Sequence, residues 1–405
     1  MKKFIVIVFI CLFCSCTVEK TEVEQRHIEP KAYSLKYRSL MEAIDEANNS
    51  FNQFFPETKS SREIDSAFFV TSNISDTLLI VVNYSNNSGF ALVAADHSET
   101  PVLGIFERGS FWDNYNNNPG FKLCYEEILA NQANSERSYL ATRSSENSYD
   151  YVTSTITSNT SFGPLVTVNW GQREPFNLYC PNNIAGCTPV AIAQAMSYFE
   201  YPNALSITYT NTISSPIRLN WRELKAHSNN ALCSPLCSTC ETLSHLLREI
   251  GYRCDANYNT NSTGAWPYAE YLSSFRYQCK ESSSFNLDDI ETYLDDYRLT
   301  LLCGFSPSGS GHTWVVDGIK RTRYTKTYYL ENPDGSATEV FSENCKDTYL
   351  HFNYGWYGDG NGFILCETEV NRNGSVTYPK TLFSGTYTDI RLQISNLRSN
   401  AAREL

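Results

Sequence analysis

The sequence of 405 residues is long enough for two or three domains, at about 150 residues per domain. Hydrophobic residues make up 41% of it and aromatic residues 14%, so the chain can bury a sizeable core, which excludes a mainly disordered protein. The 20 Gly and 15 Pro are too few for a collagen-like fibre. The 32 Lys and Arg against 44 Asp and Glu give a net charge of -12, which disfavours nucleic acid as a partner because an acidic surface repels phosphates.

The N-terminus has the pattern of an export signal. Two lysines precede an apolar run, Phe4 to Phe13, which is shorter than a membrane-spanning helix needs. Cys16 follows Ser15 where the polar chain begins, and a small residue before such a cysteine is typical of lipoproteins. We therefore predict a lipoprotein signal peptide over residues 1–16, a lipid anchor at Cys16, and a place on the bacterial cell envelope or surface, with release after processing as a possibility. Simple secretion after cleavage near Ser15 is the alternative.

The chain has 14 cysteines, of which ten lie from Cys180 to Cys366. Cys237 and Cys240 form one CxxC, which raises the question of a zinc site. No second CxxC follows, and His227 and His245 do not have the spacing of the usual histidine pair. Disulfides or buried thiols are therefore favoured, and their pairing cannot be deduced from spacing. We predict no metal and no cofactor.

Residues 17–145 are expected to form one small α+β unit. Its apolar residues occur at helical spacing or in short continuous runs with turn residues between them. The expected elements are a helix beginning near Ser39, strands over Thr77–Tyr84, Gly89–Ala95 and Pro101–Phe106, and a closing helix over Tyr125–Ala133.

A polar stretch separates this unit from the rest. Thirteen of the 22 residues from Ala141 to Phe162 are Ser, Thr or Asn, which cannot bury enough apolar surface to order themselves. We expect an exposed linker over 146–162 that is open to proteolysis. Arg143 is the candidate site for a trypsin-like protease, and Arg137 and uncharged sites compete with it. Residues 163–405 form the second unit.

One cysteine has the setting of a nucleophile. The apolar run Val190–Phe199 predicts a helix, with Thr188 as its cap, Pro189 in its first turn and Pro202 beyond its end. Cys187 then lies at the helix N-terminus, where unpaired N–H groups and the helix dipole favour a thiolate. A buried small residue at a helix start is the alternative.

Two later segments provide partners for such a thiol. A Gly-rich turn, Ser306 to Gly311, precedes His312, and a neutral imidazole there can accept a thiol proton, although a structural histidine is the alternative. Asn353 can accept the second imidazole N–H, and Trp356 can cover that bond; a Gly-rich turn between core strands is the other interpretation. His351 is the rival base, since it lies two residues before Asn353 and on the same strand face.

The order Gln172, Cys187, His312, Asn353 resembles the papain-like cysteine peptidases, and more specifically the streptopain family. The likeness extends over residues 30 to 390. The stretches that carry it are Trp170–Gln172 with Pro175–Asn177, Gly186–Cys187 with Ala193–Met196, Gly311–His312 with Val316–Gly318, Asn353–Trp356, and, in the first unit, Ser88–Asp96 with Thr100–Gly104.

The resemblance implies an α+β fold: a papain-like two-lobed peptidase with a helical lobe carrying Cys187 and an antiparallel-sheet lobe carrying His312. An α+β inhibitory propeptide, residues 17–145, would precede it. The propeptide would pack on the catalytic domain, residues 163–405, and keep the histidine out of place. Cleavage in the polar linker, by an activating protease or by the chain itself, would release it.

The resemblance also implies roles for single residues. Cys187 would attack a peptide carbonyl and His312 would move the proton. The Gln172 amide and the Cys187 N–H would form the oxyanion hole. Asn353 would orient His312, and Trp356 would cover their contact. The implied function is a secreted, lipid-anchored cysteine endopeptidase made as a zymogen, which acts on proteins and peptides.

Two departures from the family are visible. Tyr354 replaces the usual Trp beside the asparagine, which we expect to tune activity. Residues Tyr258–Ala265 match the Gly/Ser-rich substrate loop only loosely, so cleavage specificity is not predicted. A non-catalytic binding or inhibitor protein on the same fold, and a papain-like cell-wall amidase or transpeptidase, are the alternatives.

Overall fold

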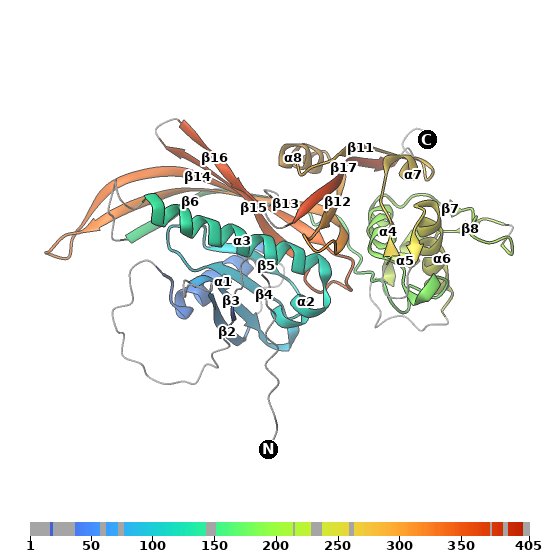
Figure 1. The fold of residues 1–405 in the computed structure, drawn as a ribbon, viewed down its shortest axis with the longest axis horizontal. Coiled ribbons are helices and arrows are strands. Elements are labelled where there is room, and N and C mark those ends of the chain that lie inside the picture. The colour runs from blue at the N-terminus through green and yellow to red at the C-terminus, as the bar shows by residue number, and fades with distance from the viewer. Residues whose placement is uncertain are drawn as a thin grey trace, which may run out of the picture.

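The computed structural model describes residues 17–18, 37–56, 62–71, 77–142, 151–213, 215–227, 237–258, 263–372, 375–383 and 388–399. The predicted signal peptide, the anchor Cys16 and the predicted cleavage site Arg143 lie outside these residues. Figure 1 shows a helical group at one end of the molecule and an N-terminal group of strands and helices packed against a long sheet. Within the described chain, no helix combines the length and the apolar character needed to cross a bilayer.

The N-terminal unit, β1 to α3, is a four-stranded meander, extended by the short β1, with helices on both sides. Ser39 caps the first helix in a capping box with Glu42, as its position before an apolar periodic run suggests. The predicted strands and the predicted closing helix are all present. The elements are β1 (Thr17–Val18), α1 (Leu40–Phe54), β2 (Ile64–Thr71), β3 (Thr77–Tyr84), β4 (Phe90–Ala94), β5 (Val102–Phe106), α2 (Phe111–Asn117) and α3 (Pro119–Thr142).

The predicted linker is partly wrong. Residues Tyr151–Phe162 form strand β6, which pairs antiparallel with the outer half of β13, from Ile319 to Tyr329. Nearly all of its side chains are exposed, so burial plays little part in its order. The ladder hydrogen bonds to β13 order it instead, and its many Thr residues suit a strand. Polar composition therefore predicted exposure correctly and irregular structure incorrectly.

The helical lobe of the C-terminal unit follows β6. Its long helices α4 and α6 pack together, and buried side chains from both helices line the first hydrophobic cluster. The elements are α4 (Cys187–Phe199), β7 (Ala204–Leu205), β8 (Ile217–Arg218), α5 (Trp221–Ala226), α6 (Ser238–Arg253), β9 (Asn257–Tyr258), β10 (Thr263–Gly264) and α7 (Ala269–Ser273).

The sheet lobe is built from long antiparallel strands. Strands β13 and β14 form the hairpin that extends to one end of the molecule in Figure 1. The strand order is β15-β14-β13-β12-β17-β11, and β16 pairs with β15. The elements are β11 (Tyr277–Ser282), α8 (Leu287–Asp295), β12 (Leu299–Phe305), β13 (Gly311–Glu331), β14 (Ala337–Asn353), β15 (Gly362–Arg372), β16 (Ser375–Thr381) and β17 (Asp389–Ser399).

The two units share one sheet. Strand β5 of the N-terminal unit pairs antiparallel with β15 of the sheet lobe, through Phe106 with Gly362 and Gly104 with Ile364. Gly362 is required here, because a Cβ on it would lie 2.1 Å from the carbonyl oxygen of Ile105. The predicted α+β fold, with a helical lobe and an antiparallel-sheet lobe after an α+β unit, is confirmed.

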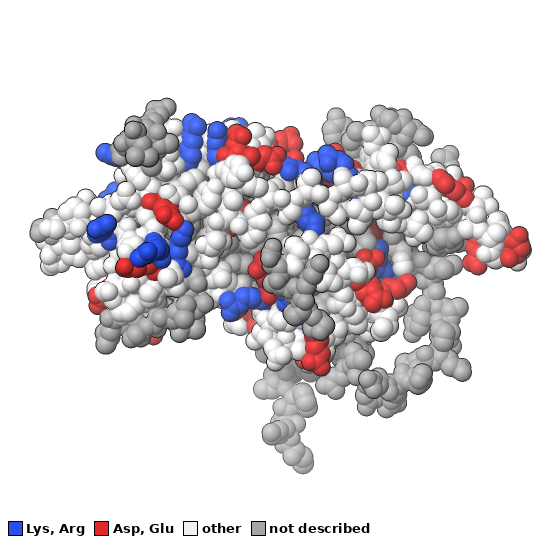
Figure 2. Space-filling view, turned by 180° about the vertical axis from the view of Figure 1, so that it is seen from behind, with Lys and Arg blue, Asp and Glu red and all other residues white. Residues whose placement is uncertain are grey.

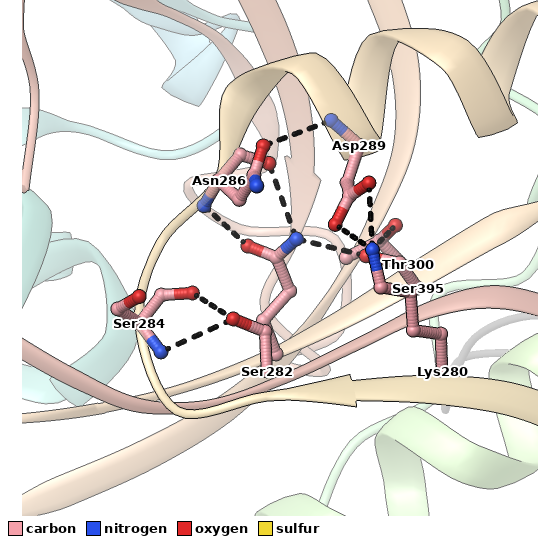
Figure 3. Close-up of polar contacts among 8 residues, drawn as sticks. Lys280, Ser282, Ser284, Asn286, Asp289, Thr300 and Ser395 are labelled. Carbon is pink, nitrogen blue, oxygen red and sulfur yellow. Dashed lines mark hydrogen bonds and ion pairs between the residues drawn. The ribbon is translucent and has the colours of Figure 1, made fainter.

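A polar network fixes helix α8 to the sheet lobe (Figure 3). The fully buried side chain of Gln393 on β17 accepts the backbone N–H of Asn286 (2.9 Å) and donates to its carbonyl (3.1 Å). Asn286 in turn caps α8 by accepting the N–H of Asp289 (3.0 Å), and Asp289 pairs with Lys280 of β11. These bonds join α8 to β11 and β17 and involve none of the predicted site residues, so we assign the network a structural role.

The charged surface is sparse. Figure 2 shows small groups of Lys and Arg interspersed with Asp and Glu on one face, which is otherwise largely uncharged. This agrees with a charged fraction of 19% in the whole sequence. Recognition by this face would therefore depend on local groups rather than on one long-range field.

Candidate active site

Cys187 is the first residue of α4, as predicted, and is partly exposed. The residue before it, Gly186, is the N-cap and has φ +93°, a conformation that favours glycine. Thr188 was expected to cap the helix, and that expectation is wrong, because Thr188 lies inside the first turn. The thiol therefore sits at the unpaired N–H end of a 13-residue helix, where negative charge is stabilised.

The hydroxyl of Thr188 joins the two lobes beside the thiol. It donates to the carbonyl of Ala265 (3.0 Å) in the helical lobe and lies 2.8 Å from the hydroxyl of Thr313 on β13. Thr313 is also within 3.2 Å of the Cys303 sulfur on β12. These buried contacts fix β13 against the start of α4, so they set the position of the residue before Thr313, His312.

The imidazole of His312 lies beside the Cys187 thiol. Burial alone would raise the pKa of this thiol, but the charge of His312 and hydrogen bonds from His312 and Thr313 outweigh burial and lower the pKa to about 7. A large fraction of the thiol is then ionised near neutral pH, and the thiolate is the nucleophilic form. The two side chains that the sequence predicted as nucleophile and base are therefore brought together.

The second imidazole nitrogen does not contact Asn353, in contrast to the prediction. His312 Nε2 lies 2.8 Å from the backbone carbonyl oxygen of Tyr354. A carbonyl oxygen only accepts, so Nε2 carries the hydrogen and Nδ1 is left to exchange a proton with the thiol. The backbone at Tyr354 thus does what the Asn353 side chain was expected to do.

Asn353 is buried and makes three hydrogen bonds away from His312. Its Nδ2 donates to the Val168 carbonyl (3.1 Å), and its Oδ1 accepts from Gln194 Nε2 (3.0 Å) and from the Gly355 N–H (3.2 Å). The predicted Asn353–His312 bond that Trp356 was to cover is therefore absent from this arrangement. Trp356 is partly buried and packs on a second hydrophobic cluster, which includes Trp314, Phe352 and Tyr354.

Gln172 is buried on the loop that leads to Cys187. Its backbone carbonyl accepts the N–H of Ala185 (2.9 Å), which fixes residues 171–173 against the turn before the helix. The ring of Tyr357 covers this loop so closely that a Cβ on Gly171 would lie 2.4 Å from it. The Tyr357 hydroxyl also accepts the N–H of Arg173 (2.9 Å). Gln172 thus lies on a well-fixed segment near the thiol, where an oxyanion-hole donor is needed.

His351, the rival base, has a different environment. Its Nδ1 lies 2.6 Å from Asp317 Oδ1, and its Nε2 lies 3.4 Å from Glu107 Oε1 of the N-terminal unit. Burial would lower its pKa, but the two carboxylates raise it to about 10. Asp317 also accepts the Val166 N–H (2.9 Å). His351 is thus a buried cation between the two units, which does not suit a base that must be neutral at pH 7.

The N-terminal unit reaches the predicted site through the first turn of α3. A Cβ on Gly120 would lie 2.5 Å from His312 Cδ2 and 2.4 Å from Tyr354 Cδ1, so only glycine fits between this helix and the imidazole. The resemblance implied a histidine displaced by the propeptide, and this is wrong here, because His312 stays beside Cys187. The missing side chain of Gly120 leaves the room that the imidazole occupies.

Sequence reasoning missed two contributors to this site. Thr313 was assigned only to a strand, although its place next to His312 was a usable signal. No sequence signal could have identified the Tyr354 carbonyl, because every residue has a backbone carbonyl and only the fold determines which one contacts the imidazole. Residues 259–262 of the predicted substrate loop lie outside the described chain.

Comparisons with known proteins agree with this geometry. Residues 170–364 match the Peptidase C10 family. Streptopain of Streptococcus pyogenes is 24% identical over 327 residues, which cover 73% of this chain and 75% of streptopain. The thiol protease/hemagglutinin PrtT of Porphyromonas gingivalis is 24% identical over 325 residues, which cover 71% of this chain but 33% of PrtT.

A solved structure shows the same fold. It is a fragment of prointerpain A from Prevotella intermedia that carries a cysteine-to-alanine mutation, with a TM-score of 0.50 and 17% identity, covering 79% of this chain and 95% of that one. These matches support the predicted resemblance to the streptopain family, Peptidase C10, and identify the chain as a cysteine-type peptidase.

Proposed function

We propose that this peptidase is an endopeptidase that is made as a zymogen and acts on proteins and peptides through Cys187 and His312. The observation that carries the proposal is the pairing of these two side chains at the N-terminus of α4, where the pKa of the thiol is lowered to about 7. A thiolate beside an imidazole at neutral pH is the arrangement that attacks an acyl carbon without a metal.

The reaction follows from the hydrogen-bond directions. The Cys187 thiolate attacks the peptide carbonyl carbon, and the proton held by His312 passes to the leaving amine. Water then hydrolyses the thioester with His312 as the base. We assign the Gln172 side-chain amide and the Cys187 N–H to the oxyanion, because both belong to the fixed segment around the helix start. The Tyr354 carbonyl holds His312 in the required tautomer throughout.

The zymogen proposal rests on how the N-terminal unit docks. Its strand β5 completes the sheet, and its α3 covers the imidazole through Gly120. Further contacts between the units are Lys320 Nζ to the Gln53 carbonyl (3.0 Å), Thr100 Oγ1 to Asp347 Oδ1 (3.1 Å) and Tyr349 OH to the Val102 carbonyl (3.0 Å). We propose that residues 17–145 inhibit by covering the site rather than by moving the histidine, and that cleavage between α3 and β6 frees it.

Export and anchoring complete the proposal. We infer a lipoprotein attached at Cys16 on the bacterial cell envelope, from the signal-like N-terminus. Replacement Cys16→Ala should move the chain from the membrane fraction to the soluble fraction. An unchanged membrane fraction would contradict the lipid anchor.

The test compares residues 17–405 with the Cys187→Ala variant, before and after a trace of trypsin, on casein. Activity that appears only after cleavage, is absent in the variant and is blocked by iodoacetamide supports the zymogen. Full activity before any cleavage contradicts inhibition by the N-terminal unit. Processing without casein hydrolysis contradicts a general endopeptidase, and release of peptidoglycan fragments in that case would favour an amidase.

A further inference from the structure

A fully buried glutamine connects the helix of Cys187 to the loop that holds His312. Gln194 lies seven residues after Cys187 on α4, so both side chains are on the same helix face. Its Nε2 donates to Asn353 Oδ1 at 3.0 Å, across the boundary between the helical and the sheet lobes. This hydrogen bond uses Asn353 Oδ1, the oxygen that was expected to accept the His312 N–H.

The orientation of this amide pair is fixed by its backbone partners. The Val168 carbonyl can only accept, so it must face the nitrogen of Asn353. The Asn353 oxygen then faces the Gly355 N–H (3.2 Å) and requires a donor from Gln194. Both amides therefore have one possible orientation, and Gln194 presents its nitrogen.

The amide pair controls the position of one carbonyl. Tyr354 lies between Asn353 and Gly355, and its carbonyl oxygen receives His312 Nε2 at 2.8 Å. The same loop packs on α4, because a Cβ on Gly355 would lie 2.7 Å from Val190. Any shift of the loop relative to α4 would move the imidazole relative to the thiol.

We propose that Gln194 is a positioning residue, which holds the Tyr354 carbonyl through Asn353 and so sets the imidazole against the thiol. This rests on the peptidase function proposed for the same site. It gives Asn353 a role through the backbone of the next residue instead of a direct bond to the histidine.

Stability alone does not account for the glutamine. Its Oε1 is buried and has no hydrogen-bond partner among the residues that the structure describes. An unpaired buried oxygen costs about 1–3 kcal/mol. An apolar side chain of the same shape would avoid that penalty, so a purely structural tether would gain from Gln194→Met. If Gln194 positions the catalytic pair, Gln194→Met should impair catalysis even where it stabilises the fold, since methionine cannot donate to Asn353.

The experiment measures alkylation of Cys187 by iodoacetamide against pH, read by mass spectrometry of its peptide. It uses the full-length chain, Gln194→Met, and Ser197→Ala as the matched control. Ser197 is equally buried on α4 and donates only to the Gln194 backbone carbonyl (2.6 Å). We expect wild type and control to share a midpoint near pH 7, and Gln194→Met to shift upward with melting temperature unchanged or raised. The kcat/KM of the processed enzyme should fall about 10- to 100-fold, as for a misplaced catalytic group.

A second variant keeps the test sharp if Gln194→Met does not fold. In Gln194→Glu, the neutral carboxyl can donate to Asn353 Oδ1 and the carboxylate cannot. Burial raises the pKa of the introduced carboxyl above its ordinary value of about 4.3, so activity relative to wild type should recover as pH falls. A pH-independent ratio, or an unchanged Cys187 midpoint in Gln194→Met, overturns the proposal. If the wild-type chain cleaves no peptide, the alkylation midpoints still decide the role of Gln194, so the two failures are distinguishable.

Discussion

Replacement of Glu107 by Gln tests whether the N-terminal unit is held by the buried cation between the two units. Glu107 follows β5, and its Oε1 lies 3.4 Å from His351 Nε2, while Asp317 occupies the other imidazole nitrogen at 2.6 Å. The pKa of His351 is raised to about 10, so the ring is charged throughout the neutral range. The stabilisation from this charge is therefore complete below the ordinary histidine pKa of 6.5 and is lost progressively as the pH rises from there to about 10.

The magnitude follows from the geometry. The 3.4 Å contact is an ion pair without hydrogen-bond geometry. Exposed ion pairs contribute about 0–1 kcal/mol to stability, and loss of one partner of a buried pair costs about 3–5 kcal/mol. The separation of 3.4 Å is long and the Glu107 side chain is 37% exposed, so solvent screening lowers the contribution, and we take about 1–2 kcal/mol. A tenfold change in an equilibrium corresponds to about 1.4 kcal/mol, so docking should weaken about 5- to 30-fold.

The assay is hydrogen exchange of the amides that pair β5 with β15, measured in a Cys187→Ala background so that no self-cleavage intervenes. In Glu107→Gln, the amides of Phe106 and Gly362 should exchange about 5- to 30-fold faster than in the unsubstituted background. Asp45→Asn is the matched control, since Asp45 is an exposed carboxylate on α1 of the same unit. Equal exchange in both variants would refute the reasoning.

Four other outcomes are expected. Labelling of Cys187 by iodoacetamide in the wild-type chain should fall as the pH drops through about 7, because the thiolate is lost there, and a midpoint near 9 would contradict the His312 contact. Gln172→Ala should lower kcat/KM of the processed enzyme about 100- to 1000-fold with an unchanged melting temperature, as for loss of an oxyanion donor. Tyr354→Trp should leave kcat/KM within about threefold, because the carbonyl is retained, although the larger ring costs about 1–3 kcal/mol in a full core, measured by urea unfolding. Gly120→Ala should shorten the lag before activity appears, because its methyl would lie 2.5 Å from His312, and an unchanged lag would show that α3 shifts freely.

The elements that the sequence predicted correctly are those with local signals. Helix α1 begins at a capping box, β3 and β4 are apolar runs around a turn, and α4 is an apolar helix with Cys187 at its start. Each of these depends on residues within one element, so periodicity and cap residues are sufficient. The pairing of Cys187 with His312 needed the family resemblance as well, because 125 residues separate them in the chain.

The errors come from partners that are distant in sequence. Strand β6 is ordered by the edge of β13, which local composition cannot reveal. Asn353 was predicted to bind His312 because its side chain can accept an imidazole N–H and because the streptopain resemblance implies that role. Burial of Gln194 decides otherwise, since that amide takes the Asn353 oxygen and leaves the next backbone carbonyl to the imidazole.

This arrangement also explains why Tyr354 can replace the usual tryptophan. The group that meets His312 is the carbonyl, which is independent of the side chain at that position. The Tyr354 ring is fully buried beside Trp314 and Phe352, so the side chain at this position needs only to fill the space in the second hydrophobic cluster. The side chain at this position therefore affects packing, while the backbone conformation determines where the carbonyl meets His312. That conformation is fixed by the hydrogen bonds of Asn353 and by the Tyr354 N–H, which donates to Asn361 Oδ1 (3.0 Å). Substitutions that disturb those amides should impair catalysis more than substitutions of the aromatic ring.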